Sequence, residues 1–260
     1  DNHYRANNNY GTFRDGNTCG EVCNKRTEVV LAGSNGGILH AFDASNGKEL
    51  WGFIPPNIIG KLQGMITSKA NATNPIHAID GQAVIKDIYY DNKWRTVLFS
   101  GLGAGGHGYF ALDVTNIKSP KHLFAFQNDP FKSTIKFWSE DETETTYDYS
   151  GGANVADAYD YRKLGESWSA PRIIRIKHNN NDKWVAVVGG GYNSGVNPNY
   201  GSAVFVIDLE DGGKVLKRID ITDSASSNIV NSVPADLAVI TADGTENANY
   251  HGGLVYVADL

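Results

Sequence analysis

Short apolar runs alternate with clusters of Gly, Asn and Asp along this sequence, and the clearest example is the stretch from Gly33 to Trp51. An apolar run from Ile38 to Phe42 is followed by the turn residues Asp43, Asn46 and Gly47, and a second run ends in a large aromatic residue. Asp, Asn and Gly gather in hairpin turns because they tolerate positive φ or cap their own backbone. The pattern therefore predicts a β-hairpin.

The same order of predicted elements recurs along the chain: strand, tight turn, strand, glycine-rich link, strand, turn, strand. Two apolar residues followed by an Asp mark the same strand of each copy, at Asp43, Asp113, Asp208 and Asp259, with spacings of 70, 95 and 51 residues. Four-stranded repeats of about 40–50 residues are typical of β-propeller blades, and longer spacings indicate insertions. We expect an all-β fold, a β-propeller with four-stranded antiparallel blades, with about three blades plus a partial one.

The repeat divides the chain into blade pieces at about 27–55, 79–127, 168–221 and 234–260. Two insertions interrupt it, 52–78 and 128–166, and we expect the functional surface there because long loops in compact domains usually carry function. Residues 1–26 are polar and lack periodicity, which predicts a connector. The first copy lacks its opening strand and the last lacks its closing strands. We therefore expect a piece of a longer protein whose open sheet edges favour dimerisation or aggregation.

Composition agrees with a turn-rich β protein, since the 260 residues include 29 Gly and 13 Tyr but a single Met. The net charge of −6, with no Lys/Arg cluster, disfavours nucleic-acid binding. The sequence has no apolar run of about 18 residues, so no membrane span is expected.

The two cysteines, Cys19 and Cys23, lie four positions apart. A small disulfide loop in an exported protein is the favoured interpretation. A pair of free thiols and a metal site remain open, although no second pair of ligands with zinc-type spacing is present.

Larger motifs carry a resemblance to known proteins. The pattern Ala-x-Asp-x-x-x-Gly-x-x-x-Trp from Ala41 to Trp51 resembles the repeat of quinoprotein-type propellers, in which the Trp packs between neighbouring blades. Three separated segments, Gly33–Asp43, Gly101–Val114 and Trp184–Ser194, together resemble the C-terminal propeller of the PilC/PilY family, the tip-associated adhesins of bacterial type IV pili. The resemblance runs from about residue 27 to the end of the chain.

This resemblance implies a non-enzymatic protein that is exported to the cell surface, at the pilus tip (fimbrium) or outer membrane. It implies roles in pilus assembly, in countering retraction, in twitching motility and in adhesion. The implied partners are minor pilins or the pilus tip, and a receptor on host cells or other surfaces. Two other functions remain as alternatives: a quinoprotein-like oxidoreductase, and a generic propeller scaffold for protein assembly.

The resemblance also implies a calcium loop just before the strand at 254–259. The residues at that place offer hard oxygen ligands at Asp243, Glu246, Asn247 and Asn249, but the family's Asp-x-Asp-x-Asp spacing is absent. Calcium takes about six to eight oxygen ligands, including several carboxylates. A polar hairpin loop without an ion is therefore favoured, and calcium is the one cofactor that remains open.

Two further features have ordinary explanations. The glycine-rich run Gly101–Gly108 is followed by a strand and not by the helix that a phosphate loop needs, so we expect a tight blade linker. The acidic segment Glu140–Glu144 is predicted to be a solvated loop. Together with the acidic residues Asp148, Asp157 and Asp160 and the aromatic residues Tyr147, Tyr149, Tyr159, Tyr161 and Trp168, it offers an extra cation site or a partner-contact surface as the alternative.

Overall fold

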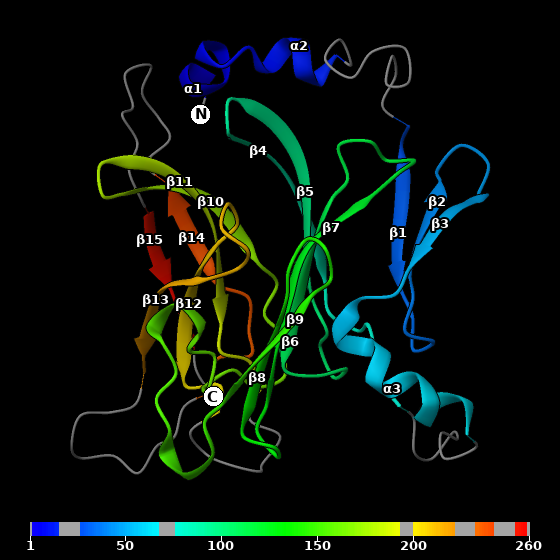
Figure 1. The fold of residues 1–260 in the computed structure, drawn as a ribbon. Helices are drawn as coiled ribbons and strands as arrows, with labels where there is room; N and C mark the ends of the chain where they lie inside the picture. The colour runs from blue at the N-terminus through cyan, green and yellow to red at the C-terminus, as the bar shows by residue number, and fades with distance from the viewer. Residues whose placement is uncertain are drawn as a thin grey trace.

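A computed structural model describes residues 2–15, 27–67, 76–192, 200–221, 232–241 and 253–258, and antiparallel sheets dominate it (Figure 1). The first sheet has three strands, β1 (Val29–Gly33), β2 (Leu39–Asp43) and β3 (Glu49–Phe53). The second has six, in the order β4 (Ala83–Tyr90), β5 (Lys93–Gly101), β6 (Gly108–Asp113), β7 (Lys121–Asp129), β8 (Thr134–Trp138) and β9 (Glu144–Asp148). The third consists of β10 (Arg172–His178), β11 (Asn181–Gly189), β12 (Ala203–Asp208) and β13 (Val215–Asp220), and the fourth of β14 (Ala238–Thr241) and β15 (Gly253–Tyr256).

The repeat seen in the sequence is also a repeat of backbone geometry. The carboxylates of Asp43, Asp113 and Asp208 each accept a hydrogen bond from the backbone N–H two residues later, at 2.8, 2.9 and 2.9 Å. In each of the three sheets a register shift interrupts the pairing one or two residues before this Asp. The repeated Asp is therefore a turn cap, as its position in the sequence predicts.

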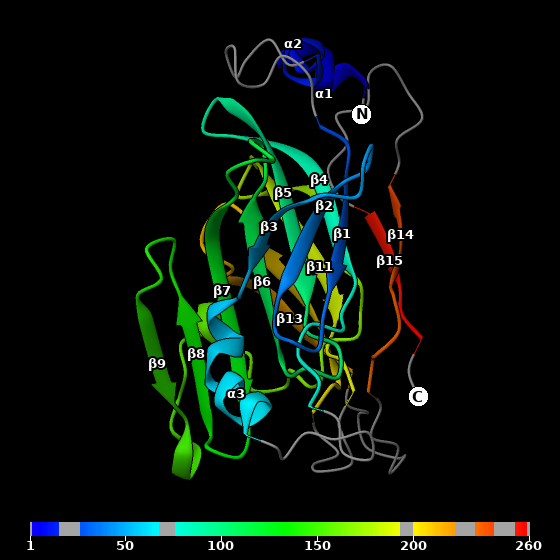
Figure 2. The ribbon, with the colours of Figure 1, turned by 90° about the vertical axis from the view of Figure 1, so that its right-hand side faces the viewer.

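In the view of Figure 2 the first sheet lies in front of the second, and the third lies behind it. Apolar side chains fill the spaces between these successive sheets. One core lies between the first and second sheets and includes Leu39, Leu98 and Leu112. Trp51 packs against this core, and its indole nitrogen donates a hydrogen bond of 2.6 Å to the carbonyl of Ile117, which follows β6. This Trp therefore joins one sheet to the next, which is the position that the repeat pattern implies.

Two glycines lie where the ends of β5 and β11 closely approach the segments that lead into the next sheets. A Cβ atom on Gly101, the last residue of β5, would lie 2.4 Å from the carbonyl oxygen of Ser167. A Cβ atom on Gly189, the last residue of β11, would lie 2.3 Å from the carbonyl oxygen of Val233. Ser167 and Val233 belong to the segments that lead into the third and fourth sheets. Only glycine permits so close an approach of two backbones, which confirms a tight linker at Gly101–Gly108, although this linker joins β5 to β6 within one sheet.

The amino-terminal connector is more ordered than the sequence suggests. It forms two short helices, α1 (Asn2–Asn7) and α2 (Tyr10–Arg14). Tyr10 packs edge-on against Trp94 at 4.7 Å, and the Trp94 indole nitrogen donates to the carbonyl of Asn8 at 2.7 Å. These helices depend on contacts with the second sheet, which the local pattern of the segment does not contain.

The two insertions also carry regular structure. The segment 52–78 contains α3 (Pro56–Ile66), which starts with Pro at its first position, where the missing N–H costs nothing. The segment 128–166 contains β8 and β9, which extend the second sheet beyond the four expected strands, and two 3₁₀ turns, η2 (Ser150–Gly152) and η3 (Asp157–Tyr159). None of the described helices is long and apolar enough to cross a membrane.

Candidate functional site

The two insertions meet at one place, beside the glycine-rich linker between β5 and β6. They form a hollow of about 400 Å³, which we call the linker hollow, lined by Lys61, Ala104, Gly106, His107, Gln127, Asn128, Asp129, Pro130, Phe131 and Glu166. α3 supplies the Lys, the end of β7 and the following turn supply the residues from 127 to 131, and the segment leading to β10 supplies the Glu. Residues more than one hundred positions apart are thus brought into one concave surface.

Lys61 and His107 are half-buried basic residues of the lining. The Lys61 ammonium donates hydrogen bonds to the carbonyls of Gly105 and His77, the latter at 3.3 Å. Burial lowers the pKa of Lys61, and burial also lowers the pKa of His107, which keeps this imidazole neutral at pH 7. The His107 Nδ1 atom is buried and has no hydrogen-bond partner in the described part of the chain.

Asn128 makes one wall of the hollow rigid. Its side chain is 1% exposed, and its amide nitrogen donates to the carbonyls of Arg162 and Leu164 at 3.2 and 2.9 Å. Its amide oxygen accepts from the hydroxyl of Tyr149 at 2.9 Å. A fully satisfied buried amide of this kind holds the loop after β7 in a single position.

One exposed aromatic residue, Phe131, lines the hollow, and two more, Trp168 and Tyr192, are bonded to its lining residue Glu166. Phe131 is 79% exposed, and Trp168 and Tyr192 are 40% and 41% exposed. The Trp168 indole nitrogen donates to the carboxylate of Glu166 at 2.9 Å. The backbone of Tyr192 exchanges hydrogen bonds of 2.8 and 2.9 Å with that of Glu166. Sequence reasoning placed Trp168 in an aromatic run with four tyrosines, and it missed Phe131 and Glu166 because neither belongs to a motif.

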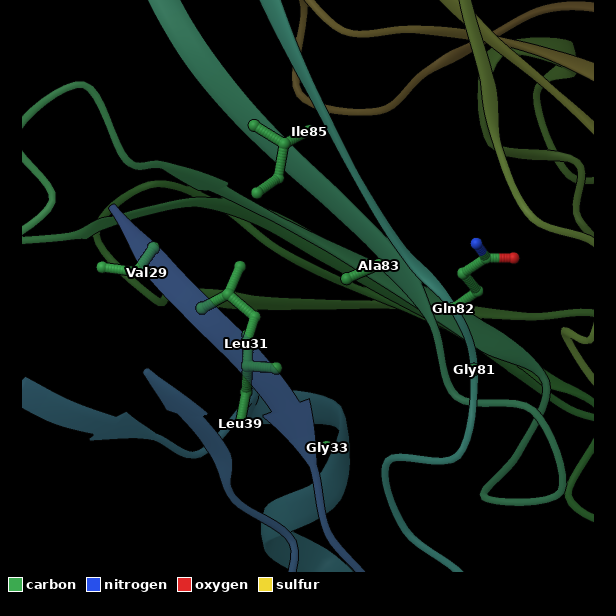
Figure 3. A pocket seen from close by; sticks show the side chains of 8 residues that line it. All are labelled: Val29, Leu31, Gly33, Leu39, Gly81, Gln82, Ala83 and Ile85. Carbon is green, nitrogen blue, oxygen red and sulfur yellow. The ribbon is translucent and has the colours of Figure 1, made fainter. Parts of the chain in front are cut away.

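A second concave surface lies at the free edge of β1. A groove of about 330 Å³ runs between β1 and the start of β4 (Figure 3). Its lining consists of Val29, Leu31, Gly33, Leu39, Gly81, Gln82, Ala83 and Ile85. Most of the lining side chains are apolar, and Figure 3 shows Leu31 pointing into the groove.

The edge of β1 that faces this groove is unpaired within the described residues. The carbonyl of Glu28 accepts a hydrogen bond from the N–H of Ala44, and the N–H of Ser34 donates one to the carbonyl of Ile38. In an antiparallel pair every second residue bonds to the partner strand, so the N–H and C=O groups of Val30 point toward β2. The N–H and C=O groups of Leu31 and its alternate neighbours therefore point toward the groove. In the second and third sheets, the corresponding edge is covered by β4 and by β10.

The acidic and aromatic residues of 140–168 do not form one surface. Tyr161 is fully buried and stacks on Phe126 at 4.0 Å between ring centroids. Asp160 is 5% exposed and pairs with Arg162 and Arg218 at 2.8 and 2.5 Å, which lowers the pKa of its carboxyl against the opposing effect of burial. These residues belong to the packing between the second and third sheets. Glu140–Glu144 is exposed and forms a turn and the start of β9.

The remaining predicted site residues fall outside the described residues: Cys19, Cys23, Asp243, Glu246, Asn247 and Asn249. The disulfide and the calcium loop therefore stay predictions. Within the ranges that the structure describes, no group of three or more His, Cys, Asp or Glu side chains is arranged to hold a metal ion.

Comparison with known proteins decides the family. The family model described as the PilY1 beta-propeller domain matches residues 4–260. The chain belongs to the PilY1 β-propeller family. A type IV pilus biogenesis factor PilY1 of Pseudomonas aeruginosa is 30% identical over 246 residues, which is 94% of this chain and 17% of that protein. A PilY1 homolog of Xylella fastidiosa is 30% identical over 240 residues, 90% of this chain and 13% of that protein.

A solved structure supports the same assignment. The crystal structure of the C-terminal domain of P. aeruginosa PilY1 matches with a TM-score of 0.61 and 26% identity, over 96% of this chain and 39% of that domain's chain. The β-propeller architecture predicted from the repeat is thereby confirmed for the PilY1 family. The chain spans less than a fifth of the length of the curated PilY1 relatives named above.

Proposed function

We propose that this chain is the propeller part of a type IV pilus biogenesis protein, and that it acts by binding other molecules and not by catalysis. The observation that carries the proposal is the match to the PilY1 propeller over residues 4–260, together with relatives that bear the name type IV pilus biogenesis factor at 30% identity. The proposed location is the cell surface, at the pilus tip or outer membrane. The proposed partners are minor pilins and a receptor on host cells or other surfaces.

The surfaces of the chain suit a binding role. The linker hollow combines a rigid polar lining with exposed aromatic residues, which are common anchors in binding sites. The groove beside β1 offers unpaired backbone groups, which can take an added strand. The linker hollow is built largely from the two predicted insertions, and the groove lies beside the blade that the sequence predicts to be incomplete.

Deletion of the gene in its native host tests the proposal. We expect loss of surface pili, of twitching motility and of adhesion, and restoration of all three by the intact gene. Unchanged piliation and motility in the deletion strain would refute the pilus role. The alternative oxidoreductase is tested separately: the purified protein should show neither quinone absorbance nor dye reduction.

Calcium binding between residues 241 and 250 remains a further proposal. Calorimetric titration of calcium into the protein, with Asp243→Ala as the comparison, measures it directly. Binding that is lost in the variant supports a calcium loop, and an absence of heat in both proteins supports an ion-free hairpin loop.

A further inference from the structure

The linker hollow has the chemistry of a site for a neutral sugar. We propose that it binds a carbohydrate, with one pyranose ring stacked on the aromatic residues at its rim. The proposal rests on the adhesive part of the proposed function and specifies the chemical class of the surface receptor. It is drawn from the arrangement of the side chains that form the hollow.

The rim supplies the stacking surface. Phe131 is 79% exposed beside the hollow, and Trp168 is 40% exposed on the neighbouring segment. The face of an aromatic ring carries partial negative charge, and the C–H groups on one face of a pyranose carry partial positive charge. A sugar ring can therefore pack flat on such a face while its hydroxyl groups remain free to form hydrogen bonds.

The lining supplies partners for hydroxyl groups. A sugar hydroxyl both donates and accepts, so it needs a site with donors and acceptors side by side. The hollow offers carboxylates at Asp129 and Glu166, an amide at Gln127, an ammonium at Lys61 and the neutral imidazole of His107. A neutral imidazole carries one donor and one acceptor nitrogen.

The same lining does not suit other ligand classes. One ammonium against two carboxylates provides no positive field for a polyanion such as nucleic acid. The described residues hold no cluster of three metal-binding side chains, so a cation would lack ligands there. An extended peptide is better matched by the unpaired edge of β1, which lies in a different groove.

The site is organised before a ligand arrives. The Trp168 indole is held by its 2.9 Å hydrogen bond to Glu166. The adjacent Ser167 hydroxyl donates toward the carbonyls of Gly106 and Gly108, at 3.0 and 2.7 Å, which joins this segment to the glycine linker. The buried amide of Asn128 fixes the loop after β7. A rigid site loses little conformational entropy on binding, which matters for a ligand that makes mostly polar contacts.

Titration with defined sugars tests the inference. The purified 260-residue chain, with folding checked by near-UV circular dichroism, is titrated with lactose, maltose, cellobiose and N,N′-diacetylchitobiose, by calorimetry and by intrinsic tryptophan fluorescence. We expect saturable binding of at least one sugar at millimolar concentration or below. Phe131→Ala and Trp168→Ala should each weaken it by about tenfold or more. Ile66→Ala, at an 83% exposed apolar residue of α3 outside the hollow, should leave it unchanged.

Two results would overturn the inference: no saturable binding of any of the four sugars, or binding that both aromatic variants leave intact. A synthetic peptide with the sequence of Ala83–Tyr90 serves as a probe for an extended polypeptide ligand. If this peptide displaces the bound sugar, and if Phe131→Ala abolishes the binding of the peptide, the inference is overturned in favour of a polypeptide ligand. Cells separate this inference from the pilus role. If both the pilus role and the sugar site are correct, a strain carrying Phe131→Ala keeps its pili and its motility but loses adhesion to surfaces coated with the bound sugar. The deletion strain loses pili, motility and adhesion.

Discussion

The indole nitrogen of Trp168 donates a hydrogen bond of 2.9 Å to the carboxylate of Glu166, two residues earlier in the chain. Both side chains lie at or beside the linker hollow, and the bond holds a 40% exposed indole in one orientation. An exposed aromatic residue that is anchored in this way presents one ring face to solvent with little freedom to move.

Removal of that anchor should loosen Trp168 without unfolding the protein. In Glu166→Ala we expect faster acrylamide quenching of tryptophan fluorescence, because the indole is released. The free energy of unfolding should fall by no more than about 1 kcal/mol, since the bond is solvent-exposed. Glu166→Gln, which keeps an acceptor oxygen, is the matched control and should quench like the parent. Equal quenching in all three proteins would show that the bond does not orient the indole.

A methyl group at Gly101 should strain the joint between the second and third sheets. The Cβ of Gly101→Ala would lie 2.4 Å from a backbone oxygen that cannot move alone, and overpacking of this kind costs about 1–3 kcal/mol. Urea denaturation measures the loss. Gly60→Ala is the control, because no atom lies within 4 Å of the Cβ position in α3 and helix propensity favours Ala by about 0.8–1.0 kcal/mol. A Gly101→Ala protein as stable as the parent would contradict the close approach of the two backbones.

Acid should destabilise the fold through His122. This side chain is 7% exposed and stacks on Phe53, with the two ring centroids 6.1 Å apart. Burial lowers the pKa of His122 below its usual value of 6.5, against a smaller opposing effect from Glu142. The unfolded chain thus binds a proton that the folded chain resists, so stability falls as pH drops below about 6.5 and levels off below the folded pKa.

Substitution of His122 provides the check. In His122→Phe, the free energy of unfolding should fall less between pH 7 and pH 5 than it does in the parent. His107, whose pKa burial also lowers, should contribute a second part of the same slope. A slope unchanged in His122→Phe would mean that this imidazole titrates as it does in water.

The free edge of β1 should promote self-association. Val30 is 56% exposed on a strand that has no charged residue, and unpaired apolar edges template pairing with other chains. Val30→Lys should shift the chain toward monomer in sedimentation velocity, because a Lys on an edge strand opposes pairing. Ile66→Lys, which adds the same charge on α3, controls for net charge and should leave the association state unchanged. A parent chain that is already a stable monomer would refute this prediction.

Much of the fold follows from local signals. Period-two apolar runs and turn residues predicted most of the strands, and the copies of Asp43 and Gly101 predicted caps and linkers that the structure contains. These features are local because a turn cap or a close backbone approach depends on a few neighbouring residues. β8 and β9 were not predicted because each is only five residues long and depends on its neighbour in the sheet, β8 on β7 and β9 on β8. The helices α1 and α2 were not predicted because their aromatic residues pack on Trp94, about eighty positions away in the sequence.

The sequence alone determined the class of fold and the residues that turn and cap each repeat, because these depend on hydrophobic period and backbone preference. Tertiary structure decided which side chains meet. Lys61, His107, Phe131 and Glu166 share no motif, and they form one hollow only because successive sheets bring α3, a glycine linker and two later loops to the same place. The exposure of β1 was likewise a tertiary outcome, since Val29–Gly33 has the composition of an interior strand and lies at an edge because no described strand pairs beside it.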